Sequence, residues 1–351
     1  MPAAALRQPI PRANLSQASG RAGNARSTRR GVALVAVHYA LYGLTLLAAV
    51  SPLPLAARLL FGAVNGVFIA LLFILGHDAA HGTLVRGRQR NLWLARFCFI
   101  PCVHAVSLWR VVHNTRHHAR TNLKGVDDVW APMSKTEYDA ASPARRWLER
   151  VYRGPFGPLI YYYGVFWIHR MLLPLALEVR KDWKRHMPDS LFVCGGFLLT
   201  LAGIVVSSRL LVPGEPLWRA LAVAWVLPFA VWNYLMAFTI YLNHTHPQIL
   251  WFEDEKLWWR FRGNVVDTVS VRMPINIAPI YTMVMAHTAH HRDLNTPVYA
   301  LLRAQKNLED QGAHTISYTL TPGTYRKIYR ACKLFDFERL CWTDFNGIPT
   351  G

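Results

Sequence analysis

Residues 59–81 read LLFGAVNGVFIALLFILGHDAAH, an apolar run that ends in two histidines four positions apart. About 20 consecutive apolar residues suffice for a helix to cross a bilayer, and residues 59–76 carry no charged side chain. Positions i and i+4 of a helix lie on one face, so His77 and His81 can reach one point. The stretch therefore predicts a membrane helix with a pair of imidazoles at one end.

Three other stretches are equally apolar, at residues 32–50, 191–212 and 217–242. Short connections around Ser51–Pro54 and Pro213–Pro216 join the four into two hairpins. We therefore predict an all-α membrane protein in which the polar segments 77–190 and 243–345 form a helical cap that carries the histidines. The predicted domains are a disordered basic arm, 1–30, and a single membrane domain, 31–345.

Three further apolar stretches are not predicted to span. Residues 92–106 are short and contain Arg96, so they are expected to be re-entrant or interfacial. Residues 160–177 contain Arg170 and Pro174 and are expected to lie along the membrane surface. Residues 265–286 contain two charged residues and two prolines, which argue against a fifth span.

The charge balance is strongly basic, with 39 Lys and Arg against 20 Asp and Glu and a net charge of +19. A nucleic-acid-binding protein can be this basic, but here the apolar residues, 52% of the chain, form long blocks separated by basic segments. That distribution is typical of membrane proteins and predicts no nucleic-acid partner. Because basic segments stay on the cytoplasmic side, the arm, the cap and the active site are expected there. The Arg-rich, acid-free arm also fits an organelle transit peptide.

The fifteen histidines are concentrated in clusters. Three clusters read HDAAH at 77–81, HNTRHH at 113–118 and HTAHH at 287–291, and a fourth, NHTH at 243–246, follows the fourth predicted span. Spans two and four end on the same side, so all four clusters can converge there. The remaining histidines stand alone and are interpreted as structural: His38, His104, His169, His186 and His314.

The clusters predict a site for two metal ions. Eight imidazoles, with one or two more from His244 and His246, are too many for one ion. Imidazole binds zinc, copper, nickel or iron, but a zinc peptidase helix would place Glu after its first histidine, where this chain has Asp78. Iron best explains an all-nitrogen dinuclear site beside a membrane.

At these residues the chain resembles the membrane fatty-acid desaturase family, whose three histidine boxes have the same spacings. GHDAAHGT, HHARTNLKGVDDVWAP, YLNHTHP and CKLFDFERLCWTDF also resemble stretches of the acyl-lipid Δ12 (oleate-type) branch. The resemblance covers residues 59–345 and implies four transmembrane helices under a cytosolic helical domain that holds two irons. The implied ligands are His77, His81, His113, His117, His118, His287, His290 and His291, with His244 preferred over His246 as a ninth. Four carboxylates are expected to orient the imidazoles through their N–H groups: Asp78, Asp127, Asp128 and Asp267.

The chain departs from the oleate-type pattern beside the boxes. Ala79-Ala80 stands where oleate-type enzymes commonly carry Cys-Gly, and Arg292-Asp293 follows the last box where an apolar residue is usual. Hydroxylation, acetylenic-bond formation and carotenoid oxidation on the same scaffold therefore remain alternatives. A metal transporter is disfavoured, because transporters place ionisable ligands within their spans and only His38 lies within one here.

The expected activity is O2-dependent desaturation of a long acyl chain carried by a lipid or an acyl carrier. An unactivated methylene has no acidic hydrogen, so a metal centre that activates O2 has to remove it. No haem, iron–sulfur or dinucleotide motif is present, so a separate ferredoxin or cytochrome b5-like protein is expected to supply electrons. Trp109, Trp130, Trp232 and Tyr234 are candidates to line an acyl tunnel, although aromatic residues at this depth more often anchor proteins at the membrane surface.

Overall fold

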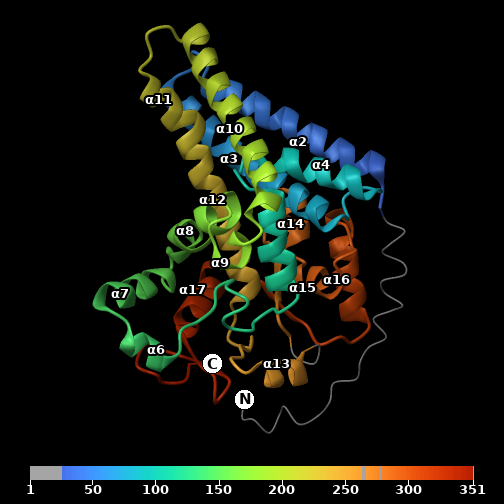
Figure 1. Cartoon of the computed structure of the whole chain (residues 1–351), viewed down its shortest axis with the longest axis vertical. Helices are drawn as coiled ribbons and strands as arrows, with labels where there is room; N and C mark the ends of the chain where they lie inside the picture. The colour runs from blue at the N-terminus through green and yellow to red at the C-terminus, as the bar shows by residue number, and fades with distance from the viewer. Residues whose placement is uncertain (1–25, 263–265, 277, 351) are drawn as a thin grey trace. The chain divides into compact units, whose positions relative to one another are not determined.

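The computed structural model describes residues 26–262, 266–276 and 278–350 (Figure 1). Most of the predicted basic arm lies outside this description, as does the side chain of His169. The chain packs into two compact units. We call Arg26–Val112 with Tyr161–Phe238 the membrane unit, and His113–Ile160 with the described part of Thr239–Gly351 the histidine unit.

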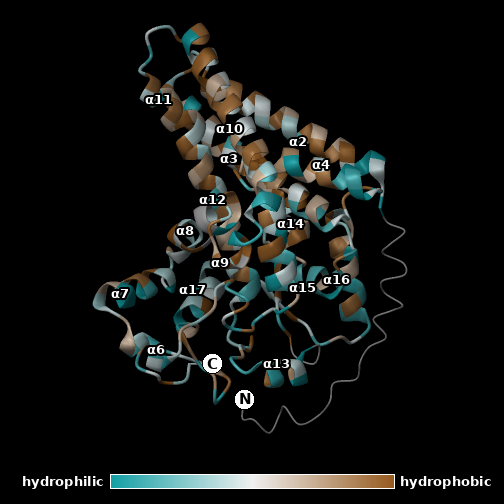
Figure 2. Ribbon diagram, viewed as in Figure 1, coloured by the Kyte–Doolittle hydropathy of each residue, from teal (hydrophilic) through white to brown (hydrophobic). Residues whose placement is uncertain are grey.

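Four helices are long and apolar enough to cross a membrane, and in the described part of the chain there are no others. They are α2 (Thr28–Ala49), α3 (Leu55–His81), α10 (Trp183–Leu211) and the continuous stretch Leu217–His244, which comprises α11 (Leu217–Leu221), η5 (Ala222–Val226) and α12 (Leu227–His244). The predicted all-α membrane fold with four spans in two hairpins is therefore confirmed, and brown apolar residues follow α2 and α10 in Figure 2. Within their described residues, the three stretches for which no span was predicted contain no helix long and apolar enough to cross a membrane.

The helices extend beyond their predicted ends. α2 begins at Thr28, inside the predicted arm, because the Ser27 hydroxyl accepts a hydrogen bond from the Arg30 amide and caps the helix. α10 begins eight residues before its predicted span, in a polar turn that hydropathy alone does not include. Helix geometry does not stop where the hydrocarbon layer stops, so apolar length underestimates helix length.

α3 is the interior helix of the membrane unit. In its most apolar window 61% of residues are buried, against 11% in α2 and 17% in α10. Gly62 and Gly66 permit close contact with the fourth span, since an added Cβ would lie 2.4 Å from the Val223 carbonyl oxygen and 2.5 Å from that of Pro228. Small residues one turn apart are a common means of close helix packing in membranes.

A buried ion pair joins the two hairpins of the membrane unit. Arg58, near the start of α3, donates two hydrogen bonds to the Glu215 carboxylate, 2.5 and 2.7 Å long, and a third, from Nε, to the Ala49 carbonyl. Glu215 lies in the turn between α10 and α11, so one side chain contacts the turns of both hairpins. The bidentate geometry satisfies both charges away from water.

Short helices complete the membrane unit: α4 (Arg88–Phe99), α5 (Val106–Arg110), η4 (Tyr163–Leu172) and α9 (Leu177–Arg180). Arg96 of α4 forms a 2.7 Å ion pair with Asp189 of α10, whose other oxygen accepts a hydrogen bond from the Ser107 amide. α4 and α5 are thereby fixed against the third span.

The histidine unit is built from short helices and two small sheets. Its elements are η3 (Val111–His118, which begins in the membrane unit), α6 (Lys135–Ala140), α7 (Pro143–Tyr152), α8 (Gly157–Tyr162, which ends in the membrane unit), α13 (Glu255–Phe261), β1 (Val269–Arg272), α14 (Pro279–Val284), α15 (His287–Arg292), η6 (Val298–Ala300), α16 (Leu301–Asp310), β2 (Ile316–Thr319), α17 (Pro322–Ala331), β3 (Leu334–Asp336) and β4 (Cys341–Thr343). β1 pairs in parallel with β2, and β3 pairs antiparallel with β4. Buried tryptophans, among them Trp130, Trp251 and Trp342, fill its core.

Candidate metal centre

The first histidine box forms the last turn of α3. The helix continues through His81 and ends where Gly82 adopts a left-handed conformation, with φ of 83°. The rings of His77 and His81 lie 4.6 Å apart, and the edge-to-face Trp109 ring lies 5.2 Å from the first and 5.6 Å from the second. The predicted i,i+4 pair is thus present in the membrane unit, at the end of one helix.

The second box lies on a π-helix, η3, in which positions i and i+5 share a face. His113 and His118 accordingly face each other, with their Nε2 atoms 2.9 Å apart. His117 points into a different group. An α-helical model of the box would have paired His113 with His117, so the π geometry changes which imidazoles meet.

The third box lies on α15 and divides in the same way. His287 and His291, four residues apart, face one group, and His290 faces the other. His290 Nε2 lies 3.2 Å from His118 Nε2. Within the histidine unit, His113, His118 and His290 therefore form one group of ring nitrogens, all within 4.8 Å of one another.

The other group is complete within the histidine unit and contains four imidazoles. Its ring nitrogens also lie within 4.8 Å of one another and come from His117, His244, His287 and His291. The Nε2 atoms of His244 and His287 are 2.9 Å apart. We call this set the four-histidine group.

His244 and His246 have different surroundings. His244 is the last residue of α12 and belongs to the four-histidine group. The His246 ring stacks on Tyr318, and its Nδ1 accepts a hydrogen bond from the Gln248 amide. The preference for His244 as the ninth imidazole agrees with this placement.

Asp127 orients one imidazole of the four-histidine group. His117 Nδ1 lies 3.0 Å from Asp127 Oδ1. A carboxylate only accepts, so Nδ1 carries the hydrogen and Nε2 keeps its lone pair for a metal. The backbone amides of Asn122 and Val129 donate to the same carboxylate, which is 1% exposed, and hold it in place.

The other three predicted carboxylates differ from Asp127. Asp128 pairs with Arg116 at 3.2 Å. The Asp267 carboxylate makes no hydrogen bond to a histidine in the described structure, and its Oδ1 is buried without a partner. Asp78 is buried on α3 between the two histidines of the first box.

Thr121 contacts two histidine boxes and was not predicted from the sequence. Its hydroxyl donates a 2.8 Å hydrogen bond to the His117 carbonyl and lies 3.5 Å from His291 Nδ1. It stands four positions after His117, so the sequence signal was the helical spacing to a histidine of the second box.

Burial keeps two imidazoles of the third box, those of His287 and His291, neutral. Desolvation, helped by the neighbouring His117, lowers the pKa of His287 to about 3. Desolvation followed by the nearby His287 also lowers the pKa of His291 well below its usual value. Neutral imidazoles have the free lone pair that metal binding requires.

Some residues outside the clusters behave as core residues. His104 is fully buried, and its Nδ1 donates to the Cys102 carbonyl at 2.6 Å, so Nε2 accepts from the Tyr162 hydroxyl at 2.7 Å. Trp109, Trp130 and Trp232 are at most 2% exposed, which excludes a role as anchors at a lipid–water interface. Tyr234 is half-buried and stacks on Phe238.

The residues present fit a metal ion. Metal–imidazole bonds are about 2.1 Å long, so nitrogens on one ion lie within about 4.2 Å of each other, and small side-chain rotations bring the observed 4.8 Å into that range. In the described structure His291 Nε2 is buried without a hydrogen-bond partner, an unusual state that a bound ion would remove. Four apolar helices long enough to cross a membrane, together with imidazole groups compatible with a metal site, are features of the class of membrane metalloproteins.

The comparisons with known proteins specify the family. The fatty acid desaturase family model matches residues 51–321. The chain therefore belongs to the fatty acid desaturase family and is an oxidoreductase.

Curated relatives are similar over most of the chain. The sn-1 acyl-lipid omega-3 desaturase (ferredoxin) of Synechocystis sp. is 26% identical over 282 residues, covering 78% of this chain and 74% of its own. The sn-1 oleoyl-lipid 12-desaturase of Synechocystis sp. is 26% identical over 277 residues, covering 78% and 75%. The chloroplastic omega-6 fatty acid desaturase of Glycine max is 25% identical over 284 residues, covering 79% and 62%.

Proposed function

We propose that this protein is an O2-dependent di-iron desaturase that introduces a double bond into a long acyl chain of a membrane lipid. The observation that carries the proposal is the division of the boxes between two imidazole groups. All-imidazole sites accept several metals, and membership of the desaturase family favours iron.

The proposed ligands are divided between the two ions. The four-histidine group binds one ion, with the Asp127 hydrogen bond fixing the His117 ring. For the second ion, we propose that His77 and His81 add to His113, His118 and His290. This assignment uses every histidine of the three boxes and His244, and it leaves out His246.

The irons, when bound, supply the O2-dependent oxidation that removes two hydrogens from adjacent methylenes. The chain's own residues position the ions. Asp127 fixes the tautomer of His117, and Thr121 lies against His291. The Trp109 ring, packed edge-to-face on both histidines of the first box, limits their rotation. Loss of such a supporting contact typically lowers metal affinity or activity about 10–100-fold.

The proposed substrate is an acyl-lipid, and the proposed position of the new double bond is Δ12. Two of the relatives above are named for oleoyl-lipid 12- or omega-6 desaturation, and one for omega-3 desaturation. Ala79 and Ala80, within the first box, are among the residues at which this chain departs from the oleate-type pattern. They are therefore the first positions to exchange if the product has its double bond elsewhere.

The proposed electron donor is a small acidic one-electron carrier of the ferredoxin or cytochrome b5 kind. One relative carries ferredoxin in its name. The net charge of +19 favours an acidic partner, because complementary charge speeds encounter. The positive-inside bias supports a cytoplasmic location of the histidine unit.

Metal analysis of the detergent-purified protein, followed by fatty-acid profiling of an expressing host, tests this function. About two irons per chain and a new unsaturated fatty acid are expected. Bound iron with a hydroxylated or acetylenic product would replace desaturation by a related oxidation. One zinc per chain, without iron after anaerobic reconstitution with ferrous ion, would contradict the proposal.

A further inference from the structure

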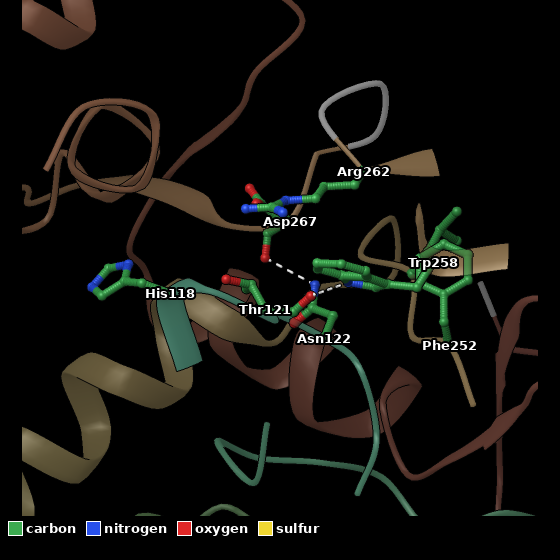
Figure 3. Close-up of a pocket in the computed structure, with 8 residues that line it drawn as sticks. His118, Thr121, Asn122, Phe252, Trp258, Arg262 and Asp267 are labelled. Carbon is green, nitrogen blue, oxygen red and sulfur yellow. Dashed lines mark hydrogen bonds between the residues drawn. The ribbon is translucent and has the colours of Figure 1, made fainter. Parts of the chain in front are cut away.

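A cavity of about 40 Å³ lies in the histidine unit beside the second box (Figure 3). His118 forms part of its wall, and so does Arg262, which is exposed to solvent. One water needs roughly 10–15 Å³ of such space. The cavity can therefore hold a small cluster of waters between solvent and a metal-binding histidine.

Two buried oxygens in the cavity wall lack hydrogen-bond partners. Asn122 is 2% exposed, and its Nδ2 donates to the Asp267 carbonyl at 3.0 Å, which fixes the orientation of the amide. Its Oδ1 and the Asp267 Oδ1 are both buried without a partner in the part of the chain described. Native proteins rarely leave buried polar atoms unsatisfied. Both atoms are acceptors, so the missing partner is a hydrogen-bond donor.

The surroundings favour a small neutral donor. The Arg262 guanidinium and the Asp267 carboxylate line the same cavity with opposite charges, so the wall favours neither a cation nor an anion over a neutral molecule. The wall is fixed on its other side, where the Trp258 indole N–H donates a 2.8 Å hydrogen bond to the Thr121 carbonyl (Figure 3). Water meets all three conditions: size, charge and donor capacity.

We propose that this cavity is the water and proton inlet of the metal centre. Ordered waters donate hydrogen bonds to Asn122 Oδ1 and Asp267 Oδ1 and connect solvent with the side of the centre formed by His118. The inference rests on the proposed desaturase function. In that reaction O2 takes up four electrons, two from the acyl chain and two from the external donor. The two hydrogens lost by the chain and two protons from solvent complete two waters, so the site needs a route for protons in and water out.

The first test is structural and does not depend on turnover. A high-resolution structure of the wild-type holoenzyme is expected to contain ordered waters within hydrogen-bond distance of Asn122 Oδ1 and of Asp267 Oδ1. A cavity that is dry, or that is filled by rearranged side chains, would overturn the inlet.

The second test narrows the cavity without removing a polar group. Leu250 lines it, and Leu250→Phe adds apolar volume there. Leu257→Phe is the matched control, since Leu257 is a partly buried leucine of the same hydrophobic cluster that does not line the cavity. Leu250→Phe is expected to keep its iron. Its turnover is expected to fall about tenfold and its solvent deuterium isotope effect to increase, because proton transfer through the narrowed cavity becomes slower and positioned proton transfer contributes roughly 10²–10⁴-fold to enzyme rates.

The outcomes separate this inference from the proposed function. Wild-type turnover and isotope effect in an iron-loaded Leu250→Phe variant would overturn the inlet and leave the desaturase intact. A wild-type protein that binds no iron would overturn the desaturase. If Leu250→Phe does not retain iron, the waters in the wild-type structure decide the question.

Discussion

At the scale of single residues, the site depends on which imidazoles share a group. Adjacent histidines of the second and third boxes point in different directions, so His117 and His118 belong to different groups, as do His290 and His291. The second and third boxes thus each contribute to both groups of ring nitrogens. Loss of one histidine is therefore expected to affect one ion first.

His244→Ala and His246→Ala form a matched pair of variants. His244→Ala is expected to lower iron content to about one per chain and to abolish desaturation, because it deletes a nitrogen of the four-histidine group. His246→Ala is expected to keep two irons, since among the described residues His246 stacks on Tyr318 and accepts a hydrogen bond from the Gln248 amide, and it belongs to neither imidazole group. Metal analysis of both proteins provides the measurement, and the reverse pattern would assign the ligand to His246.

Asp127→Ala should weaken iron binding while leaving every histidine in place. The variant removes the acceptor that fixes the His117 tautomer, and loss of such a partner typically costs about 10–100-fold in metal affinity or activity. Titration with ferrous ion measures the affinity, and Asp139→Ala, which removes an exposed carboxylate paired only with Lys135 in the described structure, is the control. Equal affinity in the two variants would show that Asp127 does not support the metal.

At the scale of elements, helix geometry determines how the boxes act. The first and third boxes lie on α-helices, where i,i+4 pairs share a face, whereas the second lies on a π-helix that pairs His113 with His118. Close packing of α3 against the fourth span positions the helix that carries the first box. Glycine, not an apolar side chain, permits that contact at positions 62 and 66.

Gly66→Ala is expected to destabilise the membrane unit by about 1–3 kcal/mol, because overpacking forces the backbone apart. The added Cβ would lie 2.5 Å from the Pro228 carbonyl oxygen. Gly203→Ala in α10 is the control, since nothing lies within 4 Å of its Cβ position and alanine is the better helix former. Thermal unfolding in detergent compares the two, and equal stability would show that α3 has room to shift.

At the scale of the whole molecule, charge is distributed unevenly. The spans contain few charged side chains, and the pair Arg58–Glu215 is buried and bidentate. Most of the basic residues that give the chain its charge of +19 lie outside the spans. The buried Arg58–Glu215 pair thus joins the two hairpins. The basic residues outside the spans are available to bind an acidic electron donor.

Glu215→Ala is expected to destabilise the protein by about 3–5 kcal/mol, because it leaves Arg58 as an uncompensated buried charge. The double variant Arg58→Met, Glu215→Leu is expected to recover most of this loss, since apolar replacement of a buried pair is often close to neutral. Unfolding midpoints of the two variants and the wild type measure the effect. A double variant as unstable as Glu215→Ala would contradict this account of the pair.

Reduction of the iron-loaded protein by an acidic carrier such as ferredoxin is expected to slow about tenfold or more as salt rises from roughly 0.01 to 0.5 M, because screening removes electrostatic steering. A small neutral reductant, which is not steered, provides the control. Stopped-flow rates that do not depend on salt would exclude an acidic docking partner.

The sequence by itself determined the class of protein and singled out the candidate metal ligands. Apolar length depends on local composition, so four spans in two hairpins could be predicted, and the box spacings identified all eight histidines and favoured His244. Asp127 was among the predicted carboxylates because the stretch around DDVWAP resembles the oleate-type branch. The helix ends were predicted less accurately, because hydropathy indicates only which residues lie in the hydrocarbon layer. The helices end where hydrogen bonds cap them, at Ser27 for α2 and at Gly82 for α3.

Only the tertiary structure decided how the site is divided. The pairing of His113 with His118 requires a π-helix, which residue spacing does not reveal. Thr121 contacts His291, 170 positions further along the chain. Asn122 donates a hydrogen bond to the carbonyl of Asp267, 145 positions further along, and each of these two residues has a buried oxygen without a partner among the described residues. Such contacts depend on the packing of distant segments. The physical reason is that local sequence sets helix propensity and hydropathy, whereas the position of a lone pair in a buried site is set by the whole fold around it.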